Sequence, residues 1–350
     1  MTCSSKCKTL LTLSFNLKSF PFKMVSLTEG QKATLSPEAV EFLTKIRHPP
    51  LANTLSSFIT SPCRVPGLRQ GFTEKTAPGE TQLIEKHKLQ ITETLIAGVS
   101  VVVIEPPTIK PGKQKKILFN VFGGAFIMGS PRDRAALTMA IELGVRVYSI
   151  DYTKSPEVKY PEARDQCLAV YGELLQNGPS GGAPVDPSNI HAMGCSSGAQ
   201  ILVSMLLVAR QQGLPMPSAG MYLCTPALDL SGAGDSMVFN SLGRDIMPVS
   251  LLTGMVSQNY APEGTNVTDP LYSPIYANYD SSFPPTVITV GTRDFALSHG
   301  IRFYWKLREA GVKVELLVSE GMWHGFNWDP VIPESIRARA AVIKFLEDAR

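Results

Sequence analysis

Short apolar runs alternate with longer amphipathic segments along most of the chain, from about Leu83 onward. The short runs have the length of buried strands, and the longer segments keep apolar residues at helical spacing. The runs that predict strands are 89–95, 99–104, 116–122, 146–152, 189–194, 219–224, 285–290 and 312–318. The segments that predict helices are 135–143, 161–175, 199–210, 300–310 and 335–349. This alternation favours an α/β fold in which helices cover both faces of a mostly parallel sheet.

Two regions do not follow the alternation. The stretch up to about residue 80 is punctuated by prolines, and an insertion at about 229–280 is rich in Gly, Ser, Asn and Met. Long segments of this kind inside a compact domain are usually functional or carry structure of their own. We therefore expect residues 25–80 and the insertion to form a cap over a catalytic domain that spans residues 81–350. Residues 1–24, basic and free of acidic side chains, are expected to be a disordered or targeting extension.

Composition narrows the class of protein. The 350 residues are 44% hydrophobic and 18% charged, which is typical of a globular enzyme and too apolar for disorder. A net charge of +3 with interspersed signs does not favour nucleic acid as a partner. The longest apolar runs are too short to span a bilayer. Six cysteines without a C-x-x-C pair favour small buried thiols over a disulfide framework or a zinc site, and hence a cytoplasmic location.

A G-x-S-x-G motif, Gly194-Cys195-Ser196-Ser197-Gly198, lies between a predicted strand and a predicted apolar helix. In that context the motif predicts a nucleophile elbow, a strained turn that lifts the serine hydroxyl clear of the sheet. The helix N-terminus beside Ser196 would favour developing negative charge. The alternative is a tight Gly/Ser turn without chemistry, so the motif needs support from other residues.

A glycine-rich loop, Phe122-Gly123-Gly124-Ala125-Phe126, follows the predicted strand at 116–122. Small residues let backbone N–H groups approach a substrate carbonyl closely. The loop residues Gly123, Gly124 and Ala125, together with Ser197, are therefore predicted to form an oxyanion hole. Taken alone, the loop could equally be a glycine turn between a strand and a helix.

Two further residues would complete a catalytic triad in the chain order serine, acid, histidine. Asp294 follows the predicted strand that ends at Val290, and His324 follows the strand that ends near Val318. Both would then lie at the sheet edge where ligands bind in open α/β folds. The other histidines, His48, His87, His191 and His299, lie outside the core pattern or within predicted elements and are expected to be packing residues.

Several motifs in order resemble the hormone-sensitive-lipase branch of the α/β-hydrolases, which includes microbial esterases and monoterpene lactone hydrolases. The motifs are Phe122-Gly-Gly-Ala-Phe126, Asp151-Tyr-Thr-Lys-Ser-Pro-Glu157, the elbow at Ser196, Asp269-Pro-Leu-Tyr-Ser-Pro274, Gly291-Thr-Arg-Asp294 and Trp323-His324-Gly-Phe326. The resemblance implies an eight-stranded α/β-hydrolase sheet with a helical cap and a carboxylesterase that needs no cofactor and no metal. It also implies esters of short to medium acyl chains as substrates.

The chain departs from this family at two places. The oxyanion loop usually begins with histidine and continues with three glycines, whereas this loop has Phe122 and Ala125. The elbow carries Cys195 and Ser197 where an acidic residue and alanine are usual. These changes indicate a specialised substrate range, and Cys195 could be either a reactive thiol or an inert buried side chain.

Seven large apolar residues of the cap and the loops are candidates for the substrate pocket. They are Phe58, Phe126, Phe239, Met247, Leu251, Met255 and Trp323. Two alternatives to an esterase remain open at this point, a lactone hydrolase of the same mechanism and a small-molecule-binding relative that has lost catalysis. The expected partner is a small-molecule ester or lactone, and a homodimer is a candidate assembly.

Overall fold

The computed structural model describes residues 23–25, 27–48, 53–241, 243–246 and 248–349. Eight strands form one sheet in the order β10-β9-β8-β7-β5-β6-β4-β3. Strands β10 through β6 run parallel, and β4 pairs antiparallel with both β6 and β3. The strands are β3 (Gln90–Ile96), β4 (Val99–Glu105), β5 (Ile117–Val121), β6 (Arg146–Ile150), β7 (Ile190–Cys195), β8 (Met221–Cys224), β9 (Thr286–Gly291) and β10 (Val314–Ser319). The predicted mostly parallel, eight-stranded sheet is confirmed.

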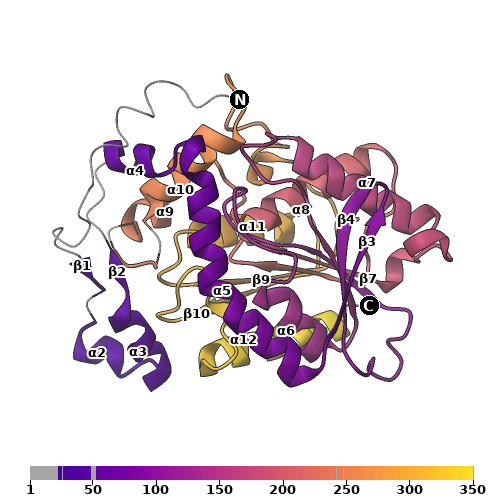
Figure 1. The fold of residues 1–350 in the computed structure, drawn as a ribbon, viewed down its shortest axis with the longest axis horizontal. Coiled ribbons are helices and arrows are strands. Elements are labelled where there is room, and N and C mark those ends of the chain that lie inside the picture. Colours follow the sequence, from indigo (N-terminus) through magenta and orange to yellow (C-terminus); the bar gives the residue numbers. More distant parts are fainter. Residues whose placement is uncertain (1–22, 26, 49–52, 242, 247, 350) are drawn as a thin grey trace.

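Helices cover both faces of the sheet (Figure 1). One apolar core lies between the sheet and three helices, α7 (Glu162–Gln176), α8 (Ser197–Gln211) and α11 (Leu297–Glu309). The core on the other face includes α6 (Arg134–Leu143) and α12 (Pro333–Glu347). Every residue of β5, β7, β8 and β9 is buried, because these central strands have helices on both sides.

The N-terminal segment and the insertion lie against each other. Helix α4 (Asn53–Ile59) packs on α10 (Val249–Met255), and the two are neighbours in Figure 1. The π-helical turn η5 (Val256–Tyr260) follows α10 directly, and its Asn259 amide donates to the carbonyl of Thr60 at 2.9 Å. A shorter helix of the insertion, α9 (Asp235–Phe239), packs on α11.

Helix α5 (Val65–His87) is a single 23-residue element that the sequence pattern did not predict. Its first residue, Val65, belongs to the apolar cluster around α10, whereas Leu83 belongs to the core beneath the sheet. The helix therefore runs through residue 80, where the sequence analysis placed the end of the cap. Its apolar residues are sparse and Pro78 lies inside it, which explains why periodicity did not reveal it.

The first described residues pack beside the end of the chain's last strand. Strand β1 (Lys23–Met24) pairs with β2 (Arg47–His48), and between them lie α2 (Glu29–Lys32) and α3 (Pro37–Lys45). The Phe42 ring stacks on Trp323 at 4.2 Å between centroids. Lys23 and Met24 belonged to the predicted extension, and its remaining residues, 1–22, lie outside the described residues. The short helical turns are η2 (Pro62–Arg64), η3 (Pro179–Gly181), η4 (Pro187–Asn189), η6 (Pro274–Tyr276) and η7 (Phe326–Trp328).

The structure also bears on the expectations about membrane spans and cysteines. Among the described residues, no helix has the length and apolar character needed to cross a membrane. Cys167, Cys195 and Cys224 are free and buried, as expected for small apolar side chains. Cys63 takes part in a disulfide bond, which the cysteine spacing did not predict.

Candidate active site

Ser196 occupies the sharp turn between β7 and α8. Its backbone has φ of 52° and ψ of −119°, a strained conformation for a residue with a side chain. The turn is tight enough to require both flanking glycines. A Cβ atom at Gly194 would lie 2.6 Å from the Cα of Ala199, and one at Gly198 would lie 2.1 Å from the carbonyl oxygen of Val121. The geometry is that of the elbow predicted from the G-x-S-x-G motif.

The loops after three parallel strands bring Ser196, Asp294 and His324 together. Nε2 of His324 lies 2.8 Å from Oγ of Ser196, and Nδ1 lies 2.8 Å from Oδ1 of Asp294. Because an ionised carboxylate only accepts, Nδ1 carries the proton and Nε2 is free to accept from the serine hydroxyl. All three side chains are at most 5% exposed, so their interactions are little weakened by water.

Opposing effects act on the basicity of His324. Burial lowers the pKa of the imidazole, but the carboxylate of Asp294, a second carboxylate at Asp245 and the Cys224 thiol raise it, and the net pKa lies above the usual 6.5. The ring of Phe295 stacks on the imidazole at 4.2 Å between centroids. The histidine is thus held in one orientation by Asp294 on one edge and Phe295 on one face.

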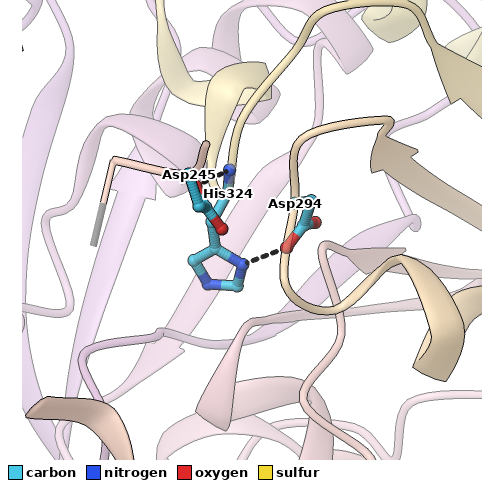
Figure 2. Close-up of side chains that lie close together, drawn as sticks. All are labelled: Asp245, Asp294 and His324. Atoms are coloured by element: carbon cyan, nitrogen blue, oxygen red, sulfur yellow. Dashed lines mark hydrogen bonds and ion pairs between the residues drawn. The ribbon is translucent and has the colours of Figure 1, made fainter. Parts of the chain in front are cut away.

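Asp245 is a buried carboxylate that the sequence analysis did not single out, and Figure 2 shows it beside Asp294 and His324. Its Oδ1 accepts from the backbone N–H of His324 at 2.9 Å, and its Oδ2 accepts from the N–H of Phe295 at 2.8 Å. Burial and the neighbouring Asp294 raise the pKa of Asp245 to about 7. No local motif marks this residue, since it lies in an irregular part of the insertion between α9 and α10.

These two carboxylates and the imidazole also invite comparison with a metal centre, since one ligand atom from each lies within 4.8 Å of the others. A metal ion would need to sit about 2 Å from each ligand atom. Here His324 and Asp294 are already joined directly at 2.8 Å, and both oxygens of Asp245 accept backbone N–H groups. The arrangement fits a hydrogen-bonded acid–base pair and does not fit a metal site.

The glycine-rich loop passes directly over Ser196. A Cβ atom at Gly123 would lie 3.1 Å from that of Ser196, and Gly124 has φ of +134°, which favours glycine. Among the described residues, no hydrogen bond uses the backbone N–H groups of Gly123, Gly124, Ala125 or Ser197. The predicted oxyanion-hole residues therefore lie around Ser196 with unused donors.

Two side chains brace this loop in place of the family's usual histidine. The Tyr152 hydroxyl donates to the carbonyl oxygen of Phe122 at 2.9 Å, and the two rings stack at 4.3 Å. The Ser197 hydroxyl accepts from the N–H of Phe126 at 3.3 Å. Ser197 stands where the family's elbow usually has alanine, and Phe122 stands where its loop usually has histidine. The Ser197 side chain thus contacts the loop that contains Phe122.

A cavity of about 400 Å³ lies beside the triad. It includes Ala227, whose N–H donates to the carbonyl oxygen of Ser196 at 3.1 Å, and Phe295, which stacks on His324. The remaining lining comes largely from the cap and the loop after β8. The lining residues are Ser57, Ala227, Asp229, Leu230, Ser231, Gly232, Met237, Ser250, Leu252, Thr253, Gly254, Val256, Ser257, Ala261, Val267, Tyr272, Phe295 and His299.

None of the six described pocket candidates lines this cavity. Phe126 stacks on Tyr260, Trp323 stacks on Phe42, and Phe58 lies under the guanidinium of Arg64. Leu251 and Met255 pack in the cap cluster, and Phe239 is 60% exposed. The seventh candidate, Met247, lies outside the described residues. The cavity is instead lined by their neighbours Ser57, Met237, Leu252 and Val256, because the opposite faces of the same helices point inward.

The remaining nucleophile and histidine candidates lie in packed positions. Cys195 is fully buried, and its pKa is raised by its hydrogen bond with Cys224 and by burial, so the thiol is inert. His191 and His299 are each only 1% exposed. Burial lowers the pKa of His299 to about 4, so that this cavity-lining imidazole is neutral at pH 7.

Comparison with known proteins places the chain in a family. A model of the alpha/beta hydrolase fold matches residues 118–327. An esterase of Acinetobacter venetianus is 32% identical over 233 residues, which make up 66% of this chain and 74% of that protein. The crystal structure of an esterase named E25 is 29% identical with a TM-score of 0.82, and the match covers 94% of this chain and 98% of that one.

A second solved structure, an esterase from the bacterial hormone-sensitive lipase family, is 27% identical with a TM-score of 0.66. That match covers 77% of this chain and 89% of the other. The family that the sequence motifs resemble is therefore confirmed. The chain belongs to the alpha/beta hydrolase fold family, has structural neighbours in the bacterial hormone-sensitive lipase family, and is a carboxylesterase.

Proposed function

We propose that this carboxylesterase works through a covalent acyl-enzyme on Ser196. The observation that carries the proposal is the unbroken hydrogen-bonded chain from the Ser196 hydroxyl through His324 to Asp294, with 2.8 Å at each step. In the proposed roles Ser196 is the nucleophile, His324 is the general base, and Asp294 fixes the tautomer of His324 and stabilises its imidazolium form.

The reaction proceeds in two halves. Oγ of Ser196 attacks the ester carbonyl carbon while Nε2 of His324 takes the hydroxyl proton, and the carbonyl oxygen gains negative charge. The unused N–H groups of Gly124, Ala125 and Ser197 would stabilise that charge. The intermediate collapses, and the alcohol leaves with the proton from His324. A water molecule then attacks the acyl-enzyme in the same manner, releasing the carboxylic acid and restoring Ser196.

The cavity favours neutral substrates of modest size. Its volume lies toward the lower end of the range of about 300–1,000 Å³ for small-molecule sites. The titratable groups in the lining are Tyr272, Asp229, whose charge is paired with Arg302, and His299, which is neutral at pH 7. The lining includes the apolar residues Ala227 and Phe295 beside the triad, and Ser57, Ser250 and Thr253 from the cap helices α4 and α10. We propose esters of short to medium acyl chains, with lactones as the alternative substrates of the same chemistry.

The test combines labelling with turnover. A fluorophosphonate probe should label Ser196, as mapped by mass spectrometry, and the protein should hydrolyse 4-nitrophenyl acetate and butyrate faster than the decanoate. The Ser196→Ala variant should lose the label and at least about 1,000-fold in kcat. Near wild-type turnover by folded Ser196→Ala would refute the assignment. A lactone assayed alongside tests the alternative substrate class.

A further inference from the structure

The insertion between β8 and β9 places one buried carboxylate beside the loops of Asp294 and His324. Asp245 lies between α9 and α10, is only 1% exposed, and accepts a hydrogen bond on each of its two oxygens. The donors are the backbone N–H groups of His324, of Phe295, which follows Asp294, and of the neighbouring Ile246. A single side chain thus ties together the loop of the proposed base and the loop of the proposed acid. Figure 2 shows its contact with His324.

The same segment secures the acid loop at further points. The Asn240 side-chain amide donates to the backbone carbonyl of Asp294 at 2.8 Å, and the Ser236 hydroxyl donates to the carbonyl of Phe295 at 2.6 Å. Asp245 alone among these three also reaches the histidine loop. The two loops also meet directly, since the N–H of Arg293 donates to the carbonyl of Met322 at 3.0 Å and the N–H of Gly321 donates to the Thr292 hydroxyl at 2.8 Å. Asp245 adds a side-chain tie at His324 itself and at the residue after Asp294.

We propose that Asp245 is a positioning residue, which sets the alignment of Asp294 with His324 by holding the backbone of both loops. This inference rests on the proposed triad mechanism. Asp245 touches no reacting atom in that mechanism, so its effect on the rate passes entirely through the base and the acid. A misplacement of about 1 Å in such a group can cost about 100-fold in rate, which sets the size of the expected effect.

The bonds to the two loops require two acceptor oxygens on one side chain. Asparagine has the same shape but offers only one acceptor oxygen, and its NH₂ group would face a backbone N–H donor. The Asp245→Asn variant should therefore lose one of the two ties without creating a cavity. We expect kcat to fall by about 10- to 100-fold while KM changes by less than about threefold, because the substrate cavity is not lined by Asp245.

A matched control is available in Asp133, which caps α6 by accepting from the N–H of Ala136 at 2.9 Å. Burial raises its pKa to about 7, as it does for Asp245, and its hydrogen bonds go to the backbone of α6 and not to the loops that carry Asp294 and His324. Asparagine is also a good N-cap. The Asp133→Asn variant should keep kcat within about twofold of wild type, which separates a positioning effect from the general effect of changing a buried aspartate.

The decisive measurement is made in a background that lacks the base. Triad members act as a unit, so removing a second one after the first costs little more. Asp245→Asn should therefore leave the residual activity of His324→Ala unchanged within about twofold, measured per folded protein by circular dichroism. An additional tenfold loss in that background would overturn the proposal, and so would a wild-type kcat in the single variant. If Asp245→Asn is unfolded while Asp133→Asn is folded, Asp245 has a folding role and the proposal is likewise overturned.

Failure of the mechanism itself would look different. If Ser196→Ala kept wild-type turnover, the triad assignment would fall, and Asp245 would have no triad to position. If Ser196→Ala is inactive but Asp245→Asn is fully active, only the positioning role is lost. The two single variants assayed together therefore distinguish the two failures.

Discussion

The pKa of His324 depends on the groups that surround its imidazole. Its imidazole is buried, and burial alone would lower its pKa, but the carboxylates of Asp294 and Asp245 and the Cys224 thiol act in the opposite direction and prevail. Only the neutral imidazole can accept the serine proton. The protonation of one residue thus determines the pH range in which the proposed base is competent.

This environment predicts the pH dependence of the reaction. Because the pKa of His324 is raised, the neutral form is lost as pH falls through a value above the usual 6.5. We expect kcat/KM to be constant at alkaline pH and to fall tenfold per pH unit on the acid side, with a midpoint above 6.5. The profile of 4-nitrophenyl acetate hydrolysis measures this midpoint in the free enzyme. A midpoint below 6.5 would contradict the balance of charges described above.

A second prediction about a single residue concerns Ser197. Its hydroxyl accepts from the N–H of Phe126, and no histidine braces the loop here. Ser197→Ala keeps all the oxyanion donors but loosens the loop, so we expect a loss in kcat of about 10-fold, less than the roughly 100- to 1,000-fold of a lost donor. Ser204→Ala, the same change in the same helix but bonded to the Leu271 carbonyl, should leave kcat unchanged. Equal effects of the two variants would show that Ser197 does not brace the loop.

At the scale of elements, the junction of β7 and α8 leaves no room for a side chain at Gly198. Gly198 has no unusual φ, yet a Cβ atom there would lie 2.1 Å from one backbone carbonyl oxygen of the β5 end and 2.4 Å from the next. Backbone atoms of a central strand cannot shift without disturbing the sheet. The close approach of α8 to β5 is what places Ser196 beneath the glycine-rich loop.

We therefore expect glycine-to-alanine substitutions at two positions to change stability in opposite directions. Gly198→Ala should destabilise the fold by more than about 2 kcal/mol through overpacking, and should abolish labelling by the fluorophosphonate. Gly71→Ala, in the exposed middle of α5 with nothing within 4 Å, should stabilise by about 0.5–1 kcal/mol. Urea unfolding measures both changes. A neutral Gly198→Ala variant would mean that α8 and β5 separate more easily than the packing indicates.

At the scale of the whole molecule, the N-terminal helix α3 supports the loop that carries His324, the proposed base. Phe42 of α3 stacks on Trp323, the residue before His324. Ser36 at the start of α3 donates to Glu334 of α12 through both its N–H and its hydroxyl, at 2.7 Å each. Residues almost 300 positions apart in sequence are thereby held together around the histidine loop.

Removing this support should cost stability. Phe42 is half-buried, so Phe42→Ala should destabilise by about 2 kcal/mol, less than the roughly 3–5 kcal/mol of a fully buried phenylalanine. Phe239, 60% exposed in α9, provides the control, and Phe239→Ala should change stability by less than about 0.5 kcal/mol. Urea midpoints followed by tryptophan fluorescence compare the two. Equal midpoints for both variants would show that α3 does not brace Trp323.

Much of this arrangement could be predicted because its signals are local. Apolar periodicity located all eight strands of the main sheet to within a few residues, since buried strands must be apolar wherever they pack. The G-x-S-x-G motif and the glycine-rich loop identified Ser196 and Gly124 through steric requirements that any such turn imposes. Asp294 and His324 followed from topology, because loops after parallel strands share one edge of the sheet.

The rest depended on contacts between segments far apart in the chain. Asp245 has no motif, and its place beside Asp294 arises only when the insertion folds onto the loops after β9 and β10. The lining of the cavity also escaped prediction, because a helix turns its side chains to all sides and only packing decides which face points inward. Local sequence patterns were enough to infer the sheet and the proposed catalytic groups. Which distant side chains hold those groups and shape the space beside them depends on packing between segments that no local pattern encodes.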